Sequence, residues 1–148
     1  MPKGLVVFAT RTNQTQKIAK LIAEGMRFEG YDIDVRNVTE IEKSGISLND
    51  YDALVLGSAT YHGEMLQSMK TFLFLAEKAD LEGKAGGAFG AFGWSGEAPG
   101  RIFDTMTHIF KMNMVQEPLR LKSADLGGGN KMAQDYGREI ARKSLASK

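Results

Sequence analysis

Hydroxyl and amide side chains gather where the first apolar segment of the chain gives way to an amphipathic one. Residues 10–15 read T-R-T-N-Q-T and include no acidic residue. If they join a strand to a helix, they offer an anion free backbone N–H groups and hydroxyl donors, and the helix dipole favours negative charge at the same point. Because a helix cap needs only one such residue, we interpret the cluster as a phosphate-binding loop.

Two further segments each place one aromatic residue among small residues. Residues 58–64 read S-A-T-Y-H-G-E, and residues 92–97 read F-G-W-S-G-E. The neighbours of Trp94 are glycine and serine rather than aliphatic residues, which favours contact with a ligand over packing in the core. An anion-binding loop flanked by two aromatic residues fits a phosphorylated planar cofactor better than a sugar phosphate or an inorganic ion.

Composition argues against several other kinds of site and partner. The 148 residues include no cysteine, which excludes disulfides, cysteine-ligated zinc, iron–sulfur clusters and thiol catalysis. Only His62 and His108 could supply imidazole ligands, so no metal site is predicted. A net charge of +1 gives no reason to expect a nucleic acid or a membrane surface as a partner. No run approaches the ~20 apolar residues of a membrane span, so we expect a cytoplasmic protein.

Apolar runs alternate with amphipathic stretches along the chain. The runs at 4–9, 51–58 and 86–92 are short and almost continuously apolar, which is typical of strands buried on both faces of a parallel sheet. Further strands are predicted at 31–38 and 114–122, the second at a sheet edge because it contains Pro118. Helical spacing predicts helices at 14–28, 39–45, 66–78, 97–112 and 130–145.

The helix predicted over 97–112 places Ile102, Phe103, Met106 and Ile109 on one side. The glycines at 127–129 that open the last helix lack a recognised phosphate-binding pattern, so we interpret them as a turn.

This order of elements predicts an open, doubly wound α/β sheet of five parallel strands with helices on both faces, formed by one domain over residues 1–148. In such sheets, ligands bind beyond the carboxyl ends of the strands. The segments 10–15, 58–64 and 92–97 follow the first, third and fourth strands. We therefore expect them to meet at one edge of the sheet.

The motifs at these three places resemble those of short-chain flavodoxins. That family has (S/T)-x-T-G-N-T after a buried strand, and residues 10–15 are similar to it, with Asn13 and Gln14 where glycine and asparagine are usual. Residues 89–98, F-G-A-F-G-W-S-G-E-A, are most similar to the flavodoxin domain of flavodiiron proteins. The resemblance covers the full length of the chain.

The resemblance implies flavin mononucleotide (FMN) as the cofactor, with its flavin between the segments that contain Tyr61 and Trp94. It implies no catalytic residue and no metal ligand. The implied cofactor contacts are Thr10, Arg11, Thr12, Asn13, Gln14, Thr15, Ala59, Thr60, Tyr61, His62, Gly63, Phe92, Gly93, Trp94, Gly96 and Glu97.

From the resemblance we expect a flavoprotein of electron transport: a small, soluble, monomeric flavodoxin that passes electrons between redox protein partners. Two alternatives stay open: an oxidoreductase on the same scaffold, of the quinone or protoporphyrinogen type, and a degenerate domain without bound FMN. A response-regulator receiver is disfavoured, because residues 10–15 include no acid and the third strand ends in Gly57-Ser58 rather than in an aspartate.

Overall fold

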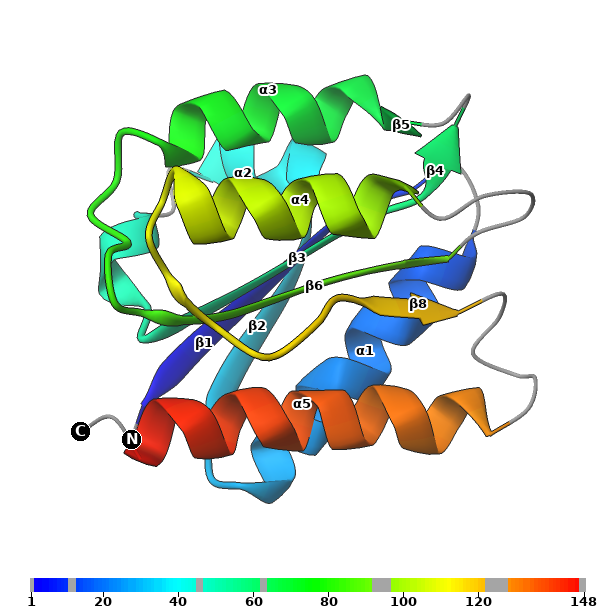
Figure 1. The fold of residues 1–148 in the computed structure, drawn as a ribbon, viewed down its shortest axis with the longest axis vertical. Helices are drawn as coiled ribbons and strands as arrows, with labels where there is room; N and C mark the ends of the chain where they lie inside the picture. Colours follow the sequence, from blue (N-terminus) through cyan, green and yellow to red (C-terminus); the bar gives the residue numbers. More distant parts are fainter. Residues whose placement is uncertain are drawn as a thin grey trace.

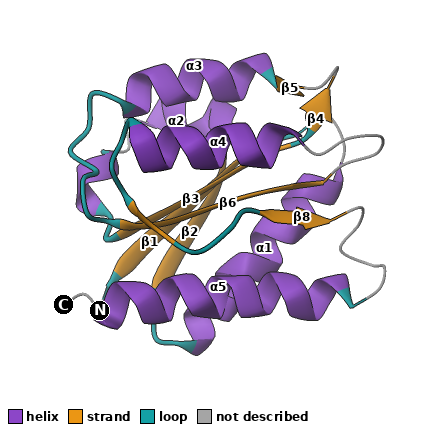
Figure 2. Cartoon of the chain, viewed as in Figure 1, coloured by secondary structure: helices purple, strands orange, loops and turns teal. Residues whose placement is uncertain are grey.

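The computed structural model describes residues 2–10, 13–44, 47–61, 64–91, 97–121 and 128–146. A parallel sheet runs through the middle of the molecule, and helices cover both of its faces (Figures 1 and 2). The strands are β1 Lys3–Ala9, β2 Asp32–Asn37, β3 Ala53–Ser58, β4 Thr60–Tyr61, β5 Glu64–Met65, β6 Ala85–Ala91, β7 Asn113–Met114 and β8 Leu119–Leu121. The helices are α1 Asn13–Phe28, α2 Val38–Ser44, α3 Gln67–Ala76, α4 Glu97–His108 and α5 Gly129–Ala146, with a short 3₁₀ turn, η1, at Leu48–Asp50.

The strands lie in the order β2-β1-β3-β6, and β7 and β8 share the fifth position beside β6. All pairs in this sheet are parallel. This is the doubly wound arrangement that the sequence predicts, and its three central strands are the runs that lack polar alternation. The sequence-based fold class is therefore confirmed.

Each face of the sheet has its own hydrophobic core, because successive side chains of a strand point to opposite faces. The core beneath α1 and α5 contains Val6, Phe8, Val55, Phe89, Ile18, Ile22 and Ile140. The core beneath α2, α3 and α4 contains Leu5, Val7, Leu54, Leu56, Phe72, Ile102 and Met106.

The strand predicted over 114–122 is interrupted. Its first part, β7, pairs with the start of β6, and its second part, β8, pairs with the end of β6. Pro118 lies directly before β8 and has no N–H to donate. The predicted position at the sheet edge is confirmed, but the prediction of one continuous strand is wrong.

Tyr136 of α5 supplies the polar contacts that the interruption removes. Its hydroxyl accepts a hydrogen bond from the Ala88 N–H at 3.1 Å and can donate to the carbonyl oxygen of Glu117 at 2.8 Å or of Ala88 at 3.0 Å. Burial raises the pKa of the phenol, so it stays protonated. The side chain thus joins β6 to the chain just before β8.

Tyr136→Phe should lower the free energy of unfolding by about 1–3 kcal/mol, because the ring still fills its space while the buried Ala88 and Glu117 groups lose their partner. Urea denaturation followed by circular dichroism measures this change. An unchanged midpoint would show that water replaces the hydroxyl at no cost.

The helix predicted over 97–112 ends earlier, at His108. The N–H groups of Ile109 and Phe110 both bond to the carbonyl of Thr105, at 2.9 and 3.1 Å, so the chain turns out of the helix there. Phe110 then enters the core, and Ile109 is 56% exposed. Ile109 therefore lies beyond the helix and does not share the side predicted for it, whereas Ile102 and Met106 lie together on the buried side of α4.

Within the described residues, no helix has the length and apolar character that crossing a lipid bilayer requires.

Candidate functional site

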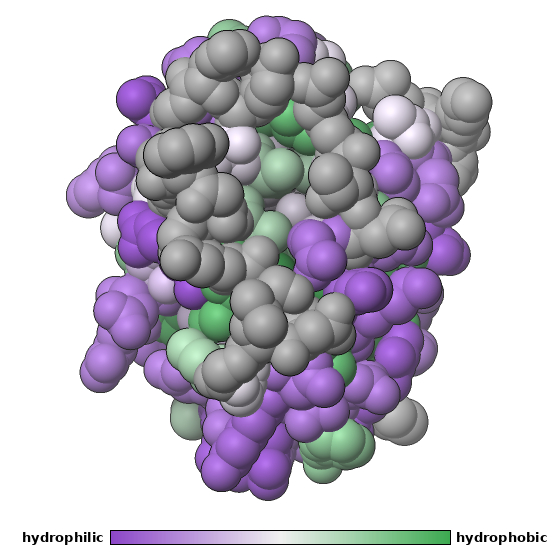
Figure 3. Space-filling view, turned by 90° about the vertical axis from the view of Figure 1, so that its right-hand side faces the viewer, coloured by the Kyte–Doolittle hydropathy of each residue, from purple (hydrophilic) through white to green (hydrophobic). Residues whose placement is uncertain are grey.

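The strands that precede the three predicted segments are neighbours in the sheet. Ala9, the last residue of β1, is paired with Ser58, the last residue of β3, and the Ala59 N–H bonds to the Ala9 carbonyl at 3.2 Å. Gly57 of β3 is paired in turn with Phe89 of β6. The chain therefore leaves the sheet at adjacent points of its carboxyl edge, as predicted. Apolar surface is visible in the middle of this end of the molecule (Figure 3).

The first segment leads into α1, which begins at Asn13, one residue earlier than predicted. The first turn of α1 contains no acidic side chain, so no carboxylate of this turn repels an anion, and the helix dipole favours negative charge there. Thr10 is half-buried at the end of β1, and Gln14 is half-buried in the first turn.

Thr15 is the most informative residue of this turn. It is fully buried, and its Oγ1 has no hydrogen-bond partner. Leaving a buried hydroxyl unsatisfied costs about 1–3 kcal/mol, and native proteins rarely do so without a reason. Among the buried side-chain polar atoms of the described residues, it is the one without a partner. A bound phosphate oxygen would supply the missing acceptor, so these residues fit a phosphate.

The second segment contains a short antiparallel hairpin, β4–β5, where the sequence predicts only a loop. The Oγ of Ser58 accepts the Leu66 N–H at 3.0 Å and donates to the Ala59 carbonyl at 2.9 Å. Ser58 thereby closes the base of the hairpin. Ser58 is absent from the predicted contacts. The sequence does offer a signal for it, because Ser58 is a polar residue at the end of a buried strand.

Thr60 links this hairpin to the helix that follows the third segment. Its Oγ1 accepts a hydrogen bond from the Ala98 N–H at 3.1 Å, in the first turn of α4. The sequence predicts Thr60 as a cofactor contact. In the structure its hydroxyl serves as a cap for α4, which fixes the distance between the second segment and the end of the third.

Thr60→Val should lower the free energy of unfolding by about 0.5–2 kcal/mol, because the Ala98 N–H loses its cap. Thr60→Ser keeps the hydroxyl and should retain most of the stability. Amide hydrogen exchange of Ala98 tests whether the lost cap is the cause. The exchange rate should rise in Thr60→Val but not in Thr60→Ser. Equal exchange in both variants would contradict a capping role.

The third segment begins after β6 and ends at Glu97, an exposed residue that opens α4. Gly90 of β6 lies where a Cβ would be 2.3 Å from the Ser58 carbonyl oxygen and 2.8 Å from Cγ of Pro99. A side chain at this position would push β6 away from both β3 and α4. The glycine therefore lets the strand that leads to the third segment lie close to the second.

Glu64, at the end of the second segment, forms an ion pair with Lys70 of α3. Nζ of Lys70 lies 2.7 Å from Oε2 of Glu64, and this hydrogen bond holds the pKa of the Glu64 carboxyl below its usual range. Both side chains are solvent-exposed, so the pair contributes little to stability. No group of three or more acidic or histidine side chains in the described part of the chain is placed to hold a metal ion.

The remaining predicted contacts either lie outside the described residues or belong to residues whose backbone alone is described. They are Arg11, Thr12, Asn13, Tyr61, His62, Gly63, Phe92, Gly93, Trp94 and Gly96.

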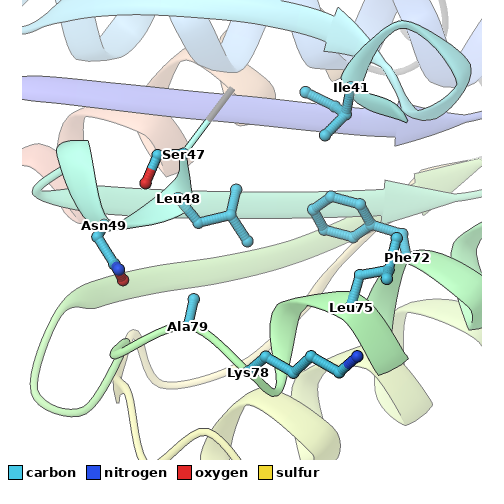
Figure 4. Close-up of a pocket in the computed structure, with 8 residues that line it drawn as sticks. All are labelled: Ile41, Ser47, Leu48, Asn49, Phe72, Leu75, Lys78 and Ala79. Atoms are coloured by element: carbon cyan, nitrogen blue, oxygen red, sulfur yellow. The ribbon is translucent and has the colours of Figure 1, made fainter. Parts of the chain in front are cut away.

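One pocket of the described surface lies away from these segments. It has a volume of about 410 Å³ and lies between η1 and the end of α3, with Leu48, Phe72 and Lys78 among its lining residues (Figure 4). Because η1 precedes β3, this pocket is at the amino end of the sheet, opposite the three segments.

A family model described as flavodoxin domain matches residues 5–127. The chain belongs to the flavodoxin family. A solved structure of a flavodoxin from the domain Archaea superposes with a TM-score of 0.89 at 28% identity, covering 97% of this chain and 99% of that chain. The flavodiiron protein of Giardia intestinalis gives a TM-score of 0.88 at 24% identity, covering 98% of this chain and 36% of that protein.

A curated relative, the rubredoxin-oxygen oxidoreductase of Megalodesulfovibrio gigas, is 28% identical over 150 residues. The match covers 97% of this chain and 37% of that protein, so the present chain spans little more than a third of the length of that relative. These findings confirm both resemblances drawn from the sequence, to flavodoxins and to the flavodoxin domain of flavodiiron proteins. Flavodoxins bind FMN, which agrees with the cofactor that the motifs indicate.

Proposed function

We propose that this flavodoxin binds FMN through its first segment and carries electrons between redox protein partners. The observation that carries the proposal is the buried, unpartnered hydroxyl of Thr15, in the acid-free first turn of α1, at the carboxyl edge of the sheet. A dianionic phosphate monoester accepts hydrogen bonds from a hydroxyl and from first-turn N–H groups alike. When bound, FMN supplies the redox chemistry, and the protein holds it and controls access to it.

The remaining segments would hold the flavin beyond the phosphate. Ser58 and Thr60 fix the hairpin that carries Tyr61, and the Thr60–Ala98 hydrogen bond ties that hairpin to α4. Gly90 brings the strand before Trp94 close to the same place. Our proposal gives Tyr61 and Trp94 the flavin-contacting roles that the resemblance implies.

Titration of the apoprotein with FMN tests the proposal directly. We expect quenching of flavin fluorescence with a dissociation constant at or below the micromolar range. Riboflavin, which lacks the phosphate, should bind at least about 100-fold more weakly, because two or more charge-assisted hydrogen bonds are lost. Absence of quenching at micromolar FMN would instead support a degenerate domain.

A second measurement separates a carrier from an oxidoreductase. An electron carrier, reduced chemically, should pass electrons to an acceptor protein such as a cytochrome but should not sustain rapid turnover with NAD(P)H and a quinone. Steady-state turnover of those substrates by the FMN-loaded protein would favour the enzyme alternative.

A further inference from the structure

The second segment, residues 58–64, contains one acidic residue, Glu64, which is not among the predicted cofactor contacts. Its side chain is exposed, and its backbone is paired with that of Tyr61 across the β4–β5 hairpin. Residues paired in this way are about 5 Å apart at their Cα atoms. With Tyr61 against the flavin, the Glu64 carboxylate lies roughly 10–15 Å from the ring, a distance at which its charge still acts on the flavin.

Cations from two helices act on this carboxylate. Nζ of Lys70 in α3 lies 2.7 Å from Oε2 of Glu64. The hydrogen bond from Lys70 and, to a smaller extent, the positive charge of Arg101 in α4 lower the pKa of Glu64, so its carboxyl is ionised at neutral pH. The hairpin lies beside the first turns of both helices (Figure 1), and α4 contacts both of its strands.

Charge near a flavin changes how easily the flavin is reduced. Two-electron reduction with uptake of one proton leaves the ring with one negative charge at neutral pH. A nearby carboxylate disfavours that charge and lowers the reduction potential, whereas a nearby cation raises it. When a carboxylate is paired with a cation, the two charges lie only a few ångströms apart, so their effects on a more distant charge largely cancel.

Given the FMN binding proposed above, on which this inference rests, we propose that Lys70 sets the reduction potential of the bound flavin by neutralising Glu64. Lys70 acts through Glu64, so it is a positioning residue and not a catalytic one. The pair is exposed and contributes little to stability. Its loss should therefore change the potential and leave folding nearly unaffected.

The other two segments contain few acidic residues. Residues 10–15 include Arg11 and no acid, and residues 92–97 include Glu97 alone. Glu64 is thus one of only two acids in the three segments, and its pairing removes much of the negative charge that would oppose the reduced flavin. The bound flavin should be easier to reduce than it would be beside an unpaired Glu64.

Potentiometric titration of the FMN-loaded protein at low ionic strength tests this role. Lys70→Gln leaves the Glu64 charge unpaired, so the ratio of the affinities for reduced and oxidised FMN should fall about threefold, which is about 15 mV for a two-electron couple. Glu64→Gln leaves the Lys70 charge unpaired and should raise the ratio by a similar factor. Lys70→Arg keeps the charge and should keep the wild-type potential.

Two controls separate the effect of charge from other causes. Lys78→Gln makes the same charge change beyond the end of α3, beside the pocket at the amino end of the sheet, and should leave the potential nearly unchanged. At about 1 M salt the screening length falls to about 3 Å, so the difference between Lys70→Gln and Glu64→Gln should largely disappear. A hairpin merely loosened by loss of the ion pair would shift both variants in the same direction.

Fluorescence titration with oxidised FMN accompanies each measurement of potential. Opposite shifts in Lys70→Gln and Glu64→Gln at low salt, with Lys78→Gln unchanged, would support the proposed role of Lys70. FMN binding by every variant with equal potentials, or with shifts of the same sign, would overturn that role and leave the proposed function intact. A wild-type protein that binds no FMN would overturn both.

Discussion

Replacing Thr15 with valine should weaken FMN binding by about 10- to 100-fold and leave the apoprotein at least as stable as before. Valine has nearly the same shape as threonine but no hydroxyl. In the apoprotein the Thr15 hydroxyl is buried without a partner, so its removal relieves a desolvation cost. In the proposed complex, the same change would remove a hydrogen bond to a charged phosphate oxygen. Affinity and stability should therefore change in opposite directions.

Fluorescence titration and urea denaturation of the same preparations measure the two effects. Thr107→Val is the matched control: its hydroxyl donates to the Phe103 carbonyl at 2.8 Å in α4, so that variant should bind FMN normally and lose no more than about 1 kcal/mol of stability. Thr15→Ser keeps the hydroxyl and should keep the affinity. If Thr15→Val bound FMN as tightly as the wild type, the phosphate site would have to lie elsewhere.

The parts of the fold that could be predicted are those determined by local patterns. The strands β1, β3 and β6 are short, continuously apolar runs, and only a buried parallel sheet accommodates several of these in alternation with helices. The interruption of the last strand could not be predicted, because it depends on a distant partner. Tyr136 completes the sheet edge from 48 residues away in sequence, and no periodicity in the segment 114–122 signals this.

The candidate site also contains features that local sequence predicts and features that only the structure reveals. A cluster of hydroxyl and amide residues between a strand and a helix indicated an anion site, and the buried Thr15 hydroxyl is the feature of the structure that supports it. The hydroxyl of Thr60, in contrast, accepts a hydrogen bond from an N–H 38 residues away, a contact that the sequence does not signal. Only three-dimensional structure reveals such a cap. The roles of Arg11, His62 and Trp94 stay predictions.

Two glycine-to-alanine changes within helices should shift stability in opposite directions. A Cβ at Gly25 of α1 would lie 1.9 Å from the backbone oxygen of Gln134 in α5. Because this neighbour is backbone, α1 and α5 would have to separate, at a cost of roughly 3 kcal/mol that exceeds the gain of about 1 kcal/mol in helix propensity. A Cβ at Gly100 would meet only the guanidinium end of Arg120, at 2.7 Å, and that side chain can move away.

Urea denaturation should therefore show a large loss of stability for Gly25→Ala and a gain of up to about 1 kcal/mol for Gly100→Ala. A gain for both would mean that the close approach of α1 and α5 does not hold the helices together. The crossing also bears on function, because α1 presents Thr15 and its first-turn N–H groups at the sheet edge. When α5 no longer fixes α1, both FMN affinity and stability should fall in Gly25→Ala. In Thr15→Val, by contrast, only FMN affinity should fall, while the stability of the apoprotein is kept.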